Sequence, residues 1–215
     1  MVKESKTEKL ARAKKIARIL DKLYPMPDIP IKHRNTWQLL VAAILSAQTT
    51  DDQVNKVTPQ LFARYPDAAS LAKAKPEDVE KIIKPVGLYR AKAANLIATA
   101  KMILERFGGE VPSTREELTQ LAGVGRKVAN VVLAYGFGKP GFPVDTHVRR
   151  LSRRLGLSEH RDPTKIEKDL CDLFPPKKWG KISLQLIYHG RRVCHAQNPK
   201  HEICALAPLC PLAND

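Results

Sequence analysis

The chain has 215 residues, in which 37 lysines and arginines outnumber 22 aspartates and glutamates and give a formal net charge of +15. No stretch approaches the roughly 18 consecutive apolar residues of a membrane helix, and the charged N-terminal segment lacks the apolar core of a signal peptide. We therefore expect a cytoplasmic protein without membrane contact, whose positive charge, spread over the whole length, favours a nucleic acid as partner. Three of the four cysteines lie near the C-terminus, which excludes an evenly spaced disulfide scaffold.

Apolar residues recur at helical spacing along the chain, and no segment shows the alternation of a half-buried strand. A first helix over residues 8–24 is predicted to end at the proline-rich segment "YPMPDIP". A second break, "GKPGFPVD", contains two prolines and two glycines and could separate two helical lobes. The chain is therefore predicted to be all-α. Further helices of the same period are predicted over residues 37–48, 76–87, 93–107 and 127–138.

The segment "LTQLAGVGRKVANVV" contains a tight turn between two helices. We expect one helix to end at Leu121 and the next to begin near Arg126, with Gly123, Val124 and Gly125 in the turn. The glycines can adopt positive φ or let another backbone come close, so that N–H groups at the helix start can face a phosphate. This is the pattern of a helix-hairpin-helix, which binds one DNA backbone without reading bases. A simple helix connection is the alternative.

Two charged residues around this turn could carry chemistry. Lys127 stands near the start of the second helix, where the positive end of the helix dipole disfavours an ammonium ion. A neutral lysine is a nucleophile for a carbon electrophile such as the C1′ atom of a sugar, although Lys127 could also be a simple phosphate contact. Asp145 precedes another helix and could be its cap. Paired with Lys127, it could instead deprotonate the amine and stabilise positive charge on a sugar.

The order of these motifs resembles a known family. "LAGVGRKVANVV" is followed by "VDTHVRRLSRRLGL" and preceded by "LLVAAILSAQTTDDQVNK" and "VGLYRAKAANLI". Together they closely resemble the endonuclease III family of the helix-hairpin-helix DNA glycosylase superfamily, over nearly the whole chain. The resemblance implies an all-α, two-lobed fold. Its helical barrel domain would span residues 29–139, and residues 1–28 and 140–215 would form a second helical domain with a metal-cluster loop at 194–210.

The resemblance also implies an activity and its residues. Lys127 matches the family's nucleophilic lysine and Asp145 its essential aspartate, which implies a bifunctional DNA glycosylase and AP lyase of base excision repair. The implied substrates are oxidised or ring-saturated pyrimidines and abasic sites in double-stranded DNA, bound by a monomer associated with the nucleoid. Two alternatives remain: a glycosylase for mismatched thymine or uracil, and a non-catalytic DNA-binding or redox-sensing module.

Four further residues are candidates for DNA contacts. A glycosylase must flip its target base, and the resemblance implies that Gln48 enters the gap while Leu88 wedges at the opposite strand. A surface glutamine and a core leucine are the alternatives for these two positions. Arg191 and Arg192, close to the cysteine segment, are expected to contact phosphates.

The cysteine segment "CHAQNPKHEICALAPLC" resembles the family's [4Fe–4S] loop, in which four cysteines are separated by six, two and five residues. In this chain His201 occupies the second position. The resemblance therefore implies a [4Fe–4S] cluster with Cys₃His ligation, since imidazole can bind iron in clusters. A Cys₃His zinc site and an absent or incomplete cluster are the alternatives. His195 is a rival ligand, and His189 is expected to be less well placed. The implied ligands are Cys194, His201, Cys204 and Cys210.

Overall fold

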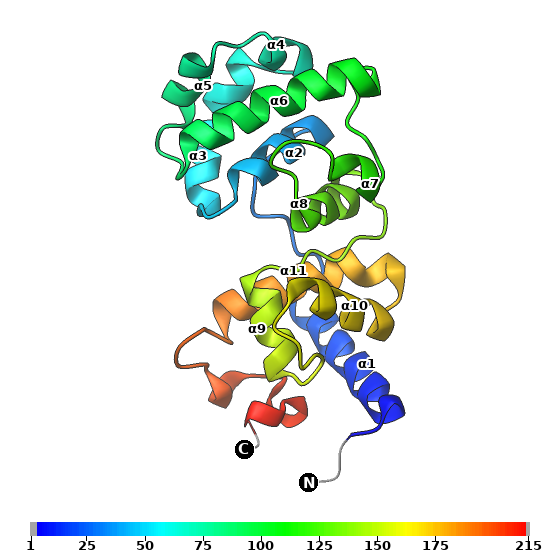
Figure 1. The fold of residues 1–215 in the computed structure, drawn as a ribbon. Coiled ribbons are helices and arrows are strands. Elements are labelled where there is room, and N and C mark those ends of the chain that lie inside the picture. Colours follow the sequence, from blue (N-terminus) through cyan, green and yellow to red (C-terminus); the bar gives the residue numbers. More distant parts are fainter. Residues whose placement is uncertain (1–3, 214–215) are drawn as a thin grey trace. The chain divides into compact units, whose positions relative to one another are not determined.

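The structure is a computed structural model and describes residues 4–213 (Figure 1). Every regular element within these residues is a helix, which confirms the all-α prediction. None of the described helices is long and apolar enough to cross a membrane. The α-helices are α1 Lys6–Leu23, α2 Thr36–Leu45, α3 Asp51–Arg64, α4 Ala68–Ala72, α5 Pro76–Ile83, α6 Tyr89–Phe107, α7 Arg115–Leu118, α8 Arg126–Val131, α9 Thr146–Arg154, α10 Pro163–Leu173 and α11 Trp179–Arg192. Shorter elements are the π-helix η1 Val132–Gly136 and the 3₁₀-helices η2 Pro176–Lys178, η3 His201–Ile203, η4 Ala207–Leu209 and η5 Pro211–Ala213.

The chain divides into two compact units. Residues 29–139 form one, which we call the hairpin unit because it contains α7, α8 and the turn between them. Residues 1–28 and 140–215 form the other, which we call the loop unit because it contains the cysteine segment. Each unit is described separately below.

The hairpin unit is built around α2, of which eight of ten residues are buried. A helix that is apolar on all sides lies inside its domain, and α2 contacts α3, α6, α8 and η1. The long helix α6 packs on α4 and α5 (Figure 1). Sequence signals place the helix starts: the side chains of Asp67 and Thr114 accept hydrogen bonds from backbone N–H groups in the first turns of α4 and α7.

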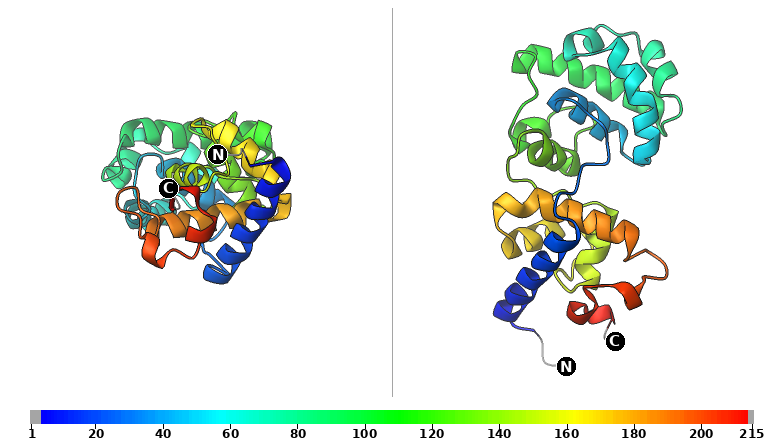
Figure 2. Two further views of the ribbon diagram at one scale, coloured as in Figure 1. Left: turned by 90° about the horizontal axis from the view of Figure 1, so that it is seen from below. Right: turned by 180° about the vertical axis from the view of Figure 1, so that it is seen from behind.

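The loop unit packs α1 against α10 and α11, and α9 against the same two helices (Figure 2). Helix α1 begins with a capping box, in which Ser5 and Glu8 satisfy each other's backbone N–H groups. The helices α9 and α11 meet closely at Gly190, where an added Cβ would lie 3.0 Å from His147 Nδ1 and from Arg150 Nη2. Glycine at this position therefore permits the approach of the two helices.

A charged contact joins α1 to the α11 region. Asp21 accepts hydrogen bonds from Lys178 at 3.2 Å and from Gln185 at 3.0 Å, and its carboxylate lies 2.8 Å from Lys181 Nζ. Burial by itself raises the pKa of Asp21, but these donors outweigh burial and lower it to about 2. The Asp21 carboxylate is therefore ionised in the folded protein at neutral pH.

Candidate functional site

The first helix of the hairpin is shorter than the sequence predicted, and the turn is correspondingly longer. Helix α7 ends at Leu118, three residues before the expected end at Leu121. Both the amide and the hydroxyl of Thr119 donate to the Arg115 carbonyl, which closes the helix there. The following turns are held by hydrogen bonds from Leu121 N to Leu118 O and from Val124 N to Leu121 O, each 3.1 Å long. A series of hydrogen-bonded turns therefore connects α7 to α8.

The two glycines of the turn have different reasons to be glycine. Gly123 has φ of +75°, and an added Cβ would lie 3.0 Å from the side-chain nitrogen of Asn95 on α6. Gly125 has φ of −86° and caps α8, and nothing lies within 4 Å of an added Cβ. Gly123 is thus required by the fold, whereas Gly125 leaves an open face at the start of α8. The turn is also tied to α6 by Thr99, whose hydroxyl donates to the Ala122 carbonyl at 2.8 Å.

Lys127 is the second residue of α8, and its side chain is exposed. This agrees with its predicted place at the helix start. The regular helix predicted to reach residue 138 is wrong in its second half, because η1 replaces it after Val131. In η1 the amide of Phe137 donates to the Val132 carbonyl five residues earlier. Such π segments frequently occur at functional sites.

Gln48 and Leu88 share an unusual backbone conformation. Their φ angles are +52° and +58°, in the left-handed region that costs a non-glycine residue about 1–3 kcal/mol. Gln48 is exposed, and Leu88 is 62% exposed, so the alternative of a core leucine is wrong. The two loops lie close together, because an added Cβ at Gly87 would be 3.7 Å from the Gln48 carbonyl oxygen. The hairpin unit therefore presents both candidates on adjacent loops.

Asp145 lies in the loop unit, at the N-cap of α9. Its Oδ1 accepts a hydrogen bond of 2.8 Å from Val148 N, so the capping role considered from sequence is present. The residue is half-buried. Burial lowers the pKa of the neighbouring His147, and the charge of Asp145 opposes that shift. Asp145 is thus a fixed carboxylate at the start of the helix that also carries Arg150 and Arg154.

The four predicted metal ligands, Cys194, His201, Cys204 and Cys210, line one cavity. Among residues 4–213, no three His, Cys, Asp or Glu side chains are grouped so that they could hold a single metal ion. Ligands of one Zn²⁺ at about 2.3 Å must lie within roughly 4.6 Å of each other. An iron–sulfur cluster binds its ligands through different irons, so it can span a wider set. The donor set therefore fits a cluster better than one zinc ion.

Two arginines of α9 hold the first part of this loop. Arg150 donates to the carbonyls of Gly190 and Cys194, with Nη2 at 2.8 Å from each. Arg154 donates to the carbonyls of His195 and Ala196, and its Nη1 lies 3.3 Å from Cys194 Sγ. These contacts attach the cysteine segment to the helix that begins after Asp145.

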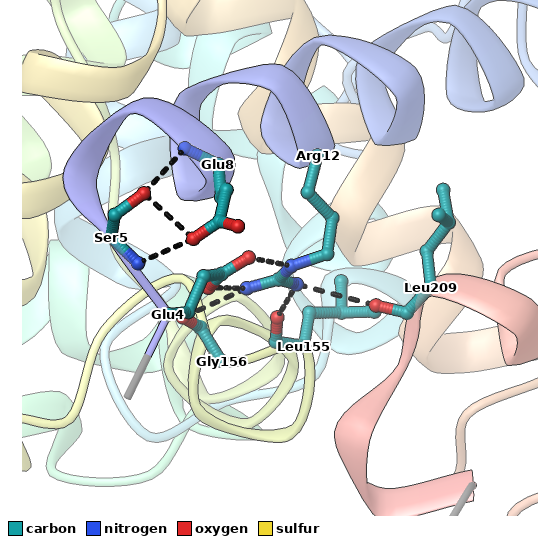
Figure 3. A network of polar contacts seen from close by, with 7 residues as sticks. All are labelled: Glu4, Ser5, Glu8, Arg12, Leu155, Gly156 and Leu209. Atoms are coloured by element: carbon teal, nitrogen blue, oxygen red, sulfur yellow. Dashed lines mark hydrogen bonds and ion pairs between the residues drawn. The ribbon is translucent and has the colours of Figure 1, made fainter. Parts of the chain in front are cut away.

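Arg12 holds the last part of the loop (Figure 3). Its guanidinium donates to the carbonyls of Leu155 and Leu209 and pairs with Glu4 at 2.7 Å. Leu209 directly precedes Cys210, so α1 contributes to the placement of the final cysteine. This contact links residues 197 positions apart, and no sequence signal indicated it.

His189, which was expected to be less well placed as a ligand, also lines the cavity. It is 2% exposed, and its Nε2 lies 3.4 Å from Cys204 Sγ. Its Nδ1 is 3.3 Å from the hydroxyl of Tyr24. Burial lowers the pKa of His189 to about 4 and raises the pKa of the Cys204 thiol. His189 is therefore a neutral imidazole, oriented on both sides and in contact with one predicted ligand.

Arg191 and Arg192 are exposed at the end of α11. The Arg192 guanidinium stacks over the rings of Tyr188 and Tyr24, at 4.9 Å and 5.7 Å from their centroids. The phosphate contacts of both arginines remain predictions.

Comparisons with known proteins assign the chain to a family. Residues 41–176 match the family described as HhH-GPD superfamily base excision DNA repair protein, and residues 194–210 match the iron-sulfur binding domain of endonuclease III. Endonuclease III of Synechocystis sp. is 52% identical over 206 residues, covering 95% of this chain and 94% of that protein. The chain belongs to the HhH-GPD superfamily of base excision DNA repair proteins.

Two solved structures agree with this membership. A non-covalent endonuclease III–DNA complex has a TM-score of 0.91 and 39% identity, covering 95% of this chain and 96% of that chain. A trapped endonuclease III–DNA covalent intermediate has a TM-score of 0.89 and 39% identity, covering 94% and 97%. This HhH-GPD protein is a DNA glycosylase with AP lyase activity in base excision repair, and DNA is its partner. Its cysteine segment is an iron–sulfur binding domain.

The HhH-GPD protein also contains functional candidates that sequence reasoning missed. Lys92, Arg150 and Arg154 were not among the candidates identified from the sequence. Each donates to backbone carbonyls of a candidate loop. In the sequence, each is a lysine or arginine beside the apolar face of a helix. Long basic side chains often lie there without any functional role, so this position did not mark them as candidates.

Proposed function

We propose that Lys127 is the nucleophile of this glycosylase. The observation that carries the proposal is its position: an exposed amine in the first turn of α8, two residues after Gly125, beside which an added Cβ would meet no atom. A phosphate held at that turn would bring the adjacent sugar near the amine. A structurally similar endonuclease III forms a covalent intermediate with DNA, and a lysine amine is suited to form one through a Schiff base.

The proposed reaction passes from base excision to strand cleavage through a Schiff base on Lys127. The Lys127 nitrogen attacks C1′ and forms the N–C1′ bond while the damaged base leaves with the electrons of the glycosidic bond. Proton loss from nitrogen and ring opening with a proton placed on O4′ give the Schiff base. Loss of a C2′ proton then breaks the C3′–O3′ bond, and the 3′ phosphate leaves. Water releases the sugar aldehyde and restores the lysine amine.

Asp145 is proposed as the carboxylate that stabilises positive charge on the sugar or accepts the lysine proton. Its cap bond to Val148 fixes Oδ1, and its partial burial keeps the carboxylate in a defined position. An Asp145→Asn variant keeps the cap geometry, since asparagine is an equally good N-cap, but removes the charge. We expect base excision to fall strongly while the free energy of unfolding changes by less than about 1 kcal/mol.

The proposed substrates are oxidised or ring-saturated pyrimidines and abasic sites in duplex DNA. Gln48 would fill the gap left by the flipped nucleotide, and Leu88 would wedge at the opposite strand, because one side chain is polar and the other apolar and both are exposed. A panel of duplexes containing thymine glycol, mismatched thymine or uracil tests this preference. Faster excision of mismatched thymine or uracil than of thymine glycol would contradict it.

The cofactor is proposed to be a [4Fe–4S] cluster bound by Cys194, His201, Cys204 and Cys210. When bound, the cluster would supply structural cross-linking of the loop. An imidazole ligand makes the site less negative and raises its reduction potential. We expect His201→Cys to keep the iron and lower the potential, and His201→Ala to lose iron. The control is His195→Ala, which should keep it. Equal iron retention in both alanine variants would exclude His201 as a ligand.

Borohydride trapping tests the proposed nucleophile. Wild-type protein on an abasic or thymine glycol duplex should give a covalent adduct, and Lys127→Ala should give none. Lys101→Ala removes an exposed lysine of α6 and should trap normally. An adduct of normal yield with Lys127→Ala would contradict the assignment.

The protein is further proposed to act as a monomer associated with the nucleoid. Its net charge of +15 favours DNA-rich surroundings, and binding dominated by phosphates should weaken steeply with salt. Sedimentation of the protein with and without duplex tests the monomer, and a 2:1 complex would contradict it.

A further inference from the structure

We propose that Lys92 is a positioning residue for DNA insertion, whose ammonium holds the loop of Gln48 against the Leu88 end of α6. The inference rests on the proposed roles of Gln48 and Leu88. It adds a buried lysine that touches neither base nor phosphate and acts through these two residues.

The Lys92 side chain ends in a complete set of acceptors. It is 4% exposed, and its Nζ donates to Leu45 O at 2.8 Å, Ala47 O at 2.6 Å and Thr49 Oγ1 at 2.8 Å. An ammonium has three N–H donors, and each has an acceptor here. Burial lowers the pKa of Lys92, but only the charged form can donate to all three atoms. The residue is therefore built into this loop and is not a solvated helix charge.

The acceptors surround Gln48. Ala47 and Thr49 are its two neighbours in sequence, and Leu45 ends α2, where the partial negative charge of the helix terminus favours a cation. Gln48 has φ of +52°, a conformation that persists in a glutamine only where its surroundings hold it. Lys92 binds the residues on both sides of Gln48 and so holds the chain in this conformation.

The backbone of Lys92 holds the other loop. Its amide donates to the Leu88 carbonyl at 3.0 Å and closes the first turn of α6. Leu88 also has positive φ, and Gly87 lies against the Gln48 carbonyl oxygen. One residue therefore connects two strained, exposed loops through its amide and its ammonium. Both candidate insertion residues share a single anchor.

This arrangement predicts a step-specific effect. Insertion is needed when a paired, stacked base must be flipped, and much less when the base is already missing. Loss of the anchor should therefore slow excision of a paired lesion more than β-elimination at an abasic site. A purely structural lysine would lower both activities together with the amount of folded protein.

The test compares Lys92→Met with Lys101→Met, which removes an exposed lysine from the same helix. In single-turnover assays on thymine glycol duplex, we expect Lys92→Met to lower excision by about tenfold to a hundredfold. β-Elimination at a preformed abasic site should fall less than about threefold, because no base needs flipping. Lys101→Met should match wild type in both assays. Equal losses by Lys92→Met in the two assays would overturn the proposal.

A double-mutant cycle tests whether Lys92 acts through Gln48. Gln48→Ala should slow excision in the wild-type background but add little in the Lys92→Met background, since its loop is already misplaced. Additive losses would contradict the proposal. If Lys92→Met is poorly folded, the cycle is run with Lys92→Arg, whose planar fork retains the charge but does not match three convergent acceptors.

Trapping and excision results together distinguish an error in the role of Lys92 from an error in the proposed nucleophile. Wild-type protein that traps on abasic DNA, together with unimpaired excision by Lys92→Met, would overturn only the anchor. Wild-type protein that neither traps nor excises would overturn the proposed nucleophile, and the positioning role would fall with it.

Discussion

The Gln48 and Leu88 loops of the hairpin unit and the cysteine loop of the loop unit are held in opposite ways. The first two lie on a continuous apolar core and are anchored by the buried Lys92. The segment 194–210 has only short 3₁₀ turns, and arginines from other helices bind its carbonyls. The insertion loops are thus organised by the core of their own unit, whereas the cysteine loop is held by side chains from α1 and α9. We expect it to depend further on its iron–sulfur group.

Removing the iron–sulfur group should have the largest effect on local stability, and this effect should be confined to the loop unit. We expect a chelated or Cys204→Ala protein to lose amide protection across residues 194–213, because binding energy at a metal site contributes directly to folding. The hairpin unit, with its own core, should keep its protection. Hydrogen–deuterium exchange measures both regions in one sample. Unchanged exchange at 194–213 would show that the loop is self-sufficient.

The two glycines of the hairpin turn should differ in their effect on stability. Gly123→Ala forces a Cβ against Asn95 at positive φ and should cost about 2–3 kcal/mol of unfolding free energy. Gly125→Ala meets no atom and should change stability by less than about 0.5 kcal/mol while weakening DNA binding. Urea unfolding and duplex titration of the two variants give the comparison. Similar stability losses would contradict the distinction between a fold glycine and a contact glycine.

Arg154→Ala should weaken the cysteine loop selectively. It removes donors to the His195 and Ala196 carbonyls and to the Cys194 sulfur, which should cost about 1–3 kcal/mol. The expected readout is faster iron release to a chelator, with hydrogen exchange of the hairpin unit unchanged. Arg153→Ala, an exposed neighbour on α9, is the control. Release at the same rate from both variants would count against the arginine clamp.

Asp21→Asn should lower the free energy of unfolding by about 1 kcal/mol near neutral pH. The folded pKa of Asp21 is about 2, below the usual value of 3.8, so its ionised form stabilises the folded state above pH 4. That contribution is lost as pH falls from about 4 to about 2. The difference between the melting temperatures of wild type and Asp21→Asn should shrink over this window. A difference that is constant with pH would exclude the carboxylate as its source.

Much of the fold was predictable because its signals are local. Helical spacing, prolines and caps such as Asp67 depend on neighbouring residues, and the all-α class followed from them. The positions of Lys127 and Asp145 at helix starts were predictable for the same reason. Local reasoning was less accurate at the end of α7, where Thr119 closes the helix early. It also missed η1, which continues α8 with a different hydrogen-bond period.

The unpredicted features depend on contacts between distant segments. Lys92 resembles any lysine of an amphipathic helix until Leu45, Ala47 and Thr49 are brought to it. His189 follows its partner Tyr24 by 165 positions, so its place at the cavity could not be read from spacing. The left-handed conformation of Gln48 likewise carries no glycine or asparagine signal.

The central claim is that Lys127 forms the covalent bond to DNA. Mass spectrometry of the borohydride-reduced adduct on abasic duplex, after proteolysis, locates the modified residue directly. We expect a single sugar-derived mass addition on the peptide that contains Lys127. An adduct on Lys101, on Lys92 or on any other lysine, with Lys127 unmodified, would contradict it.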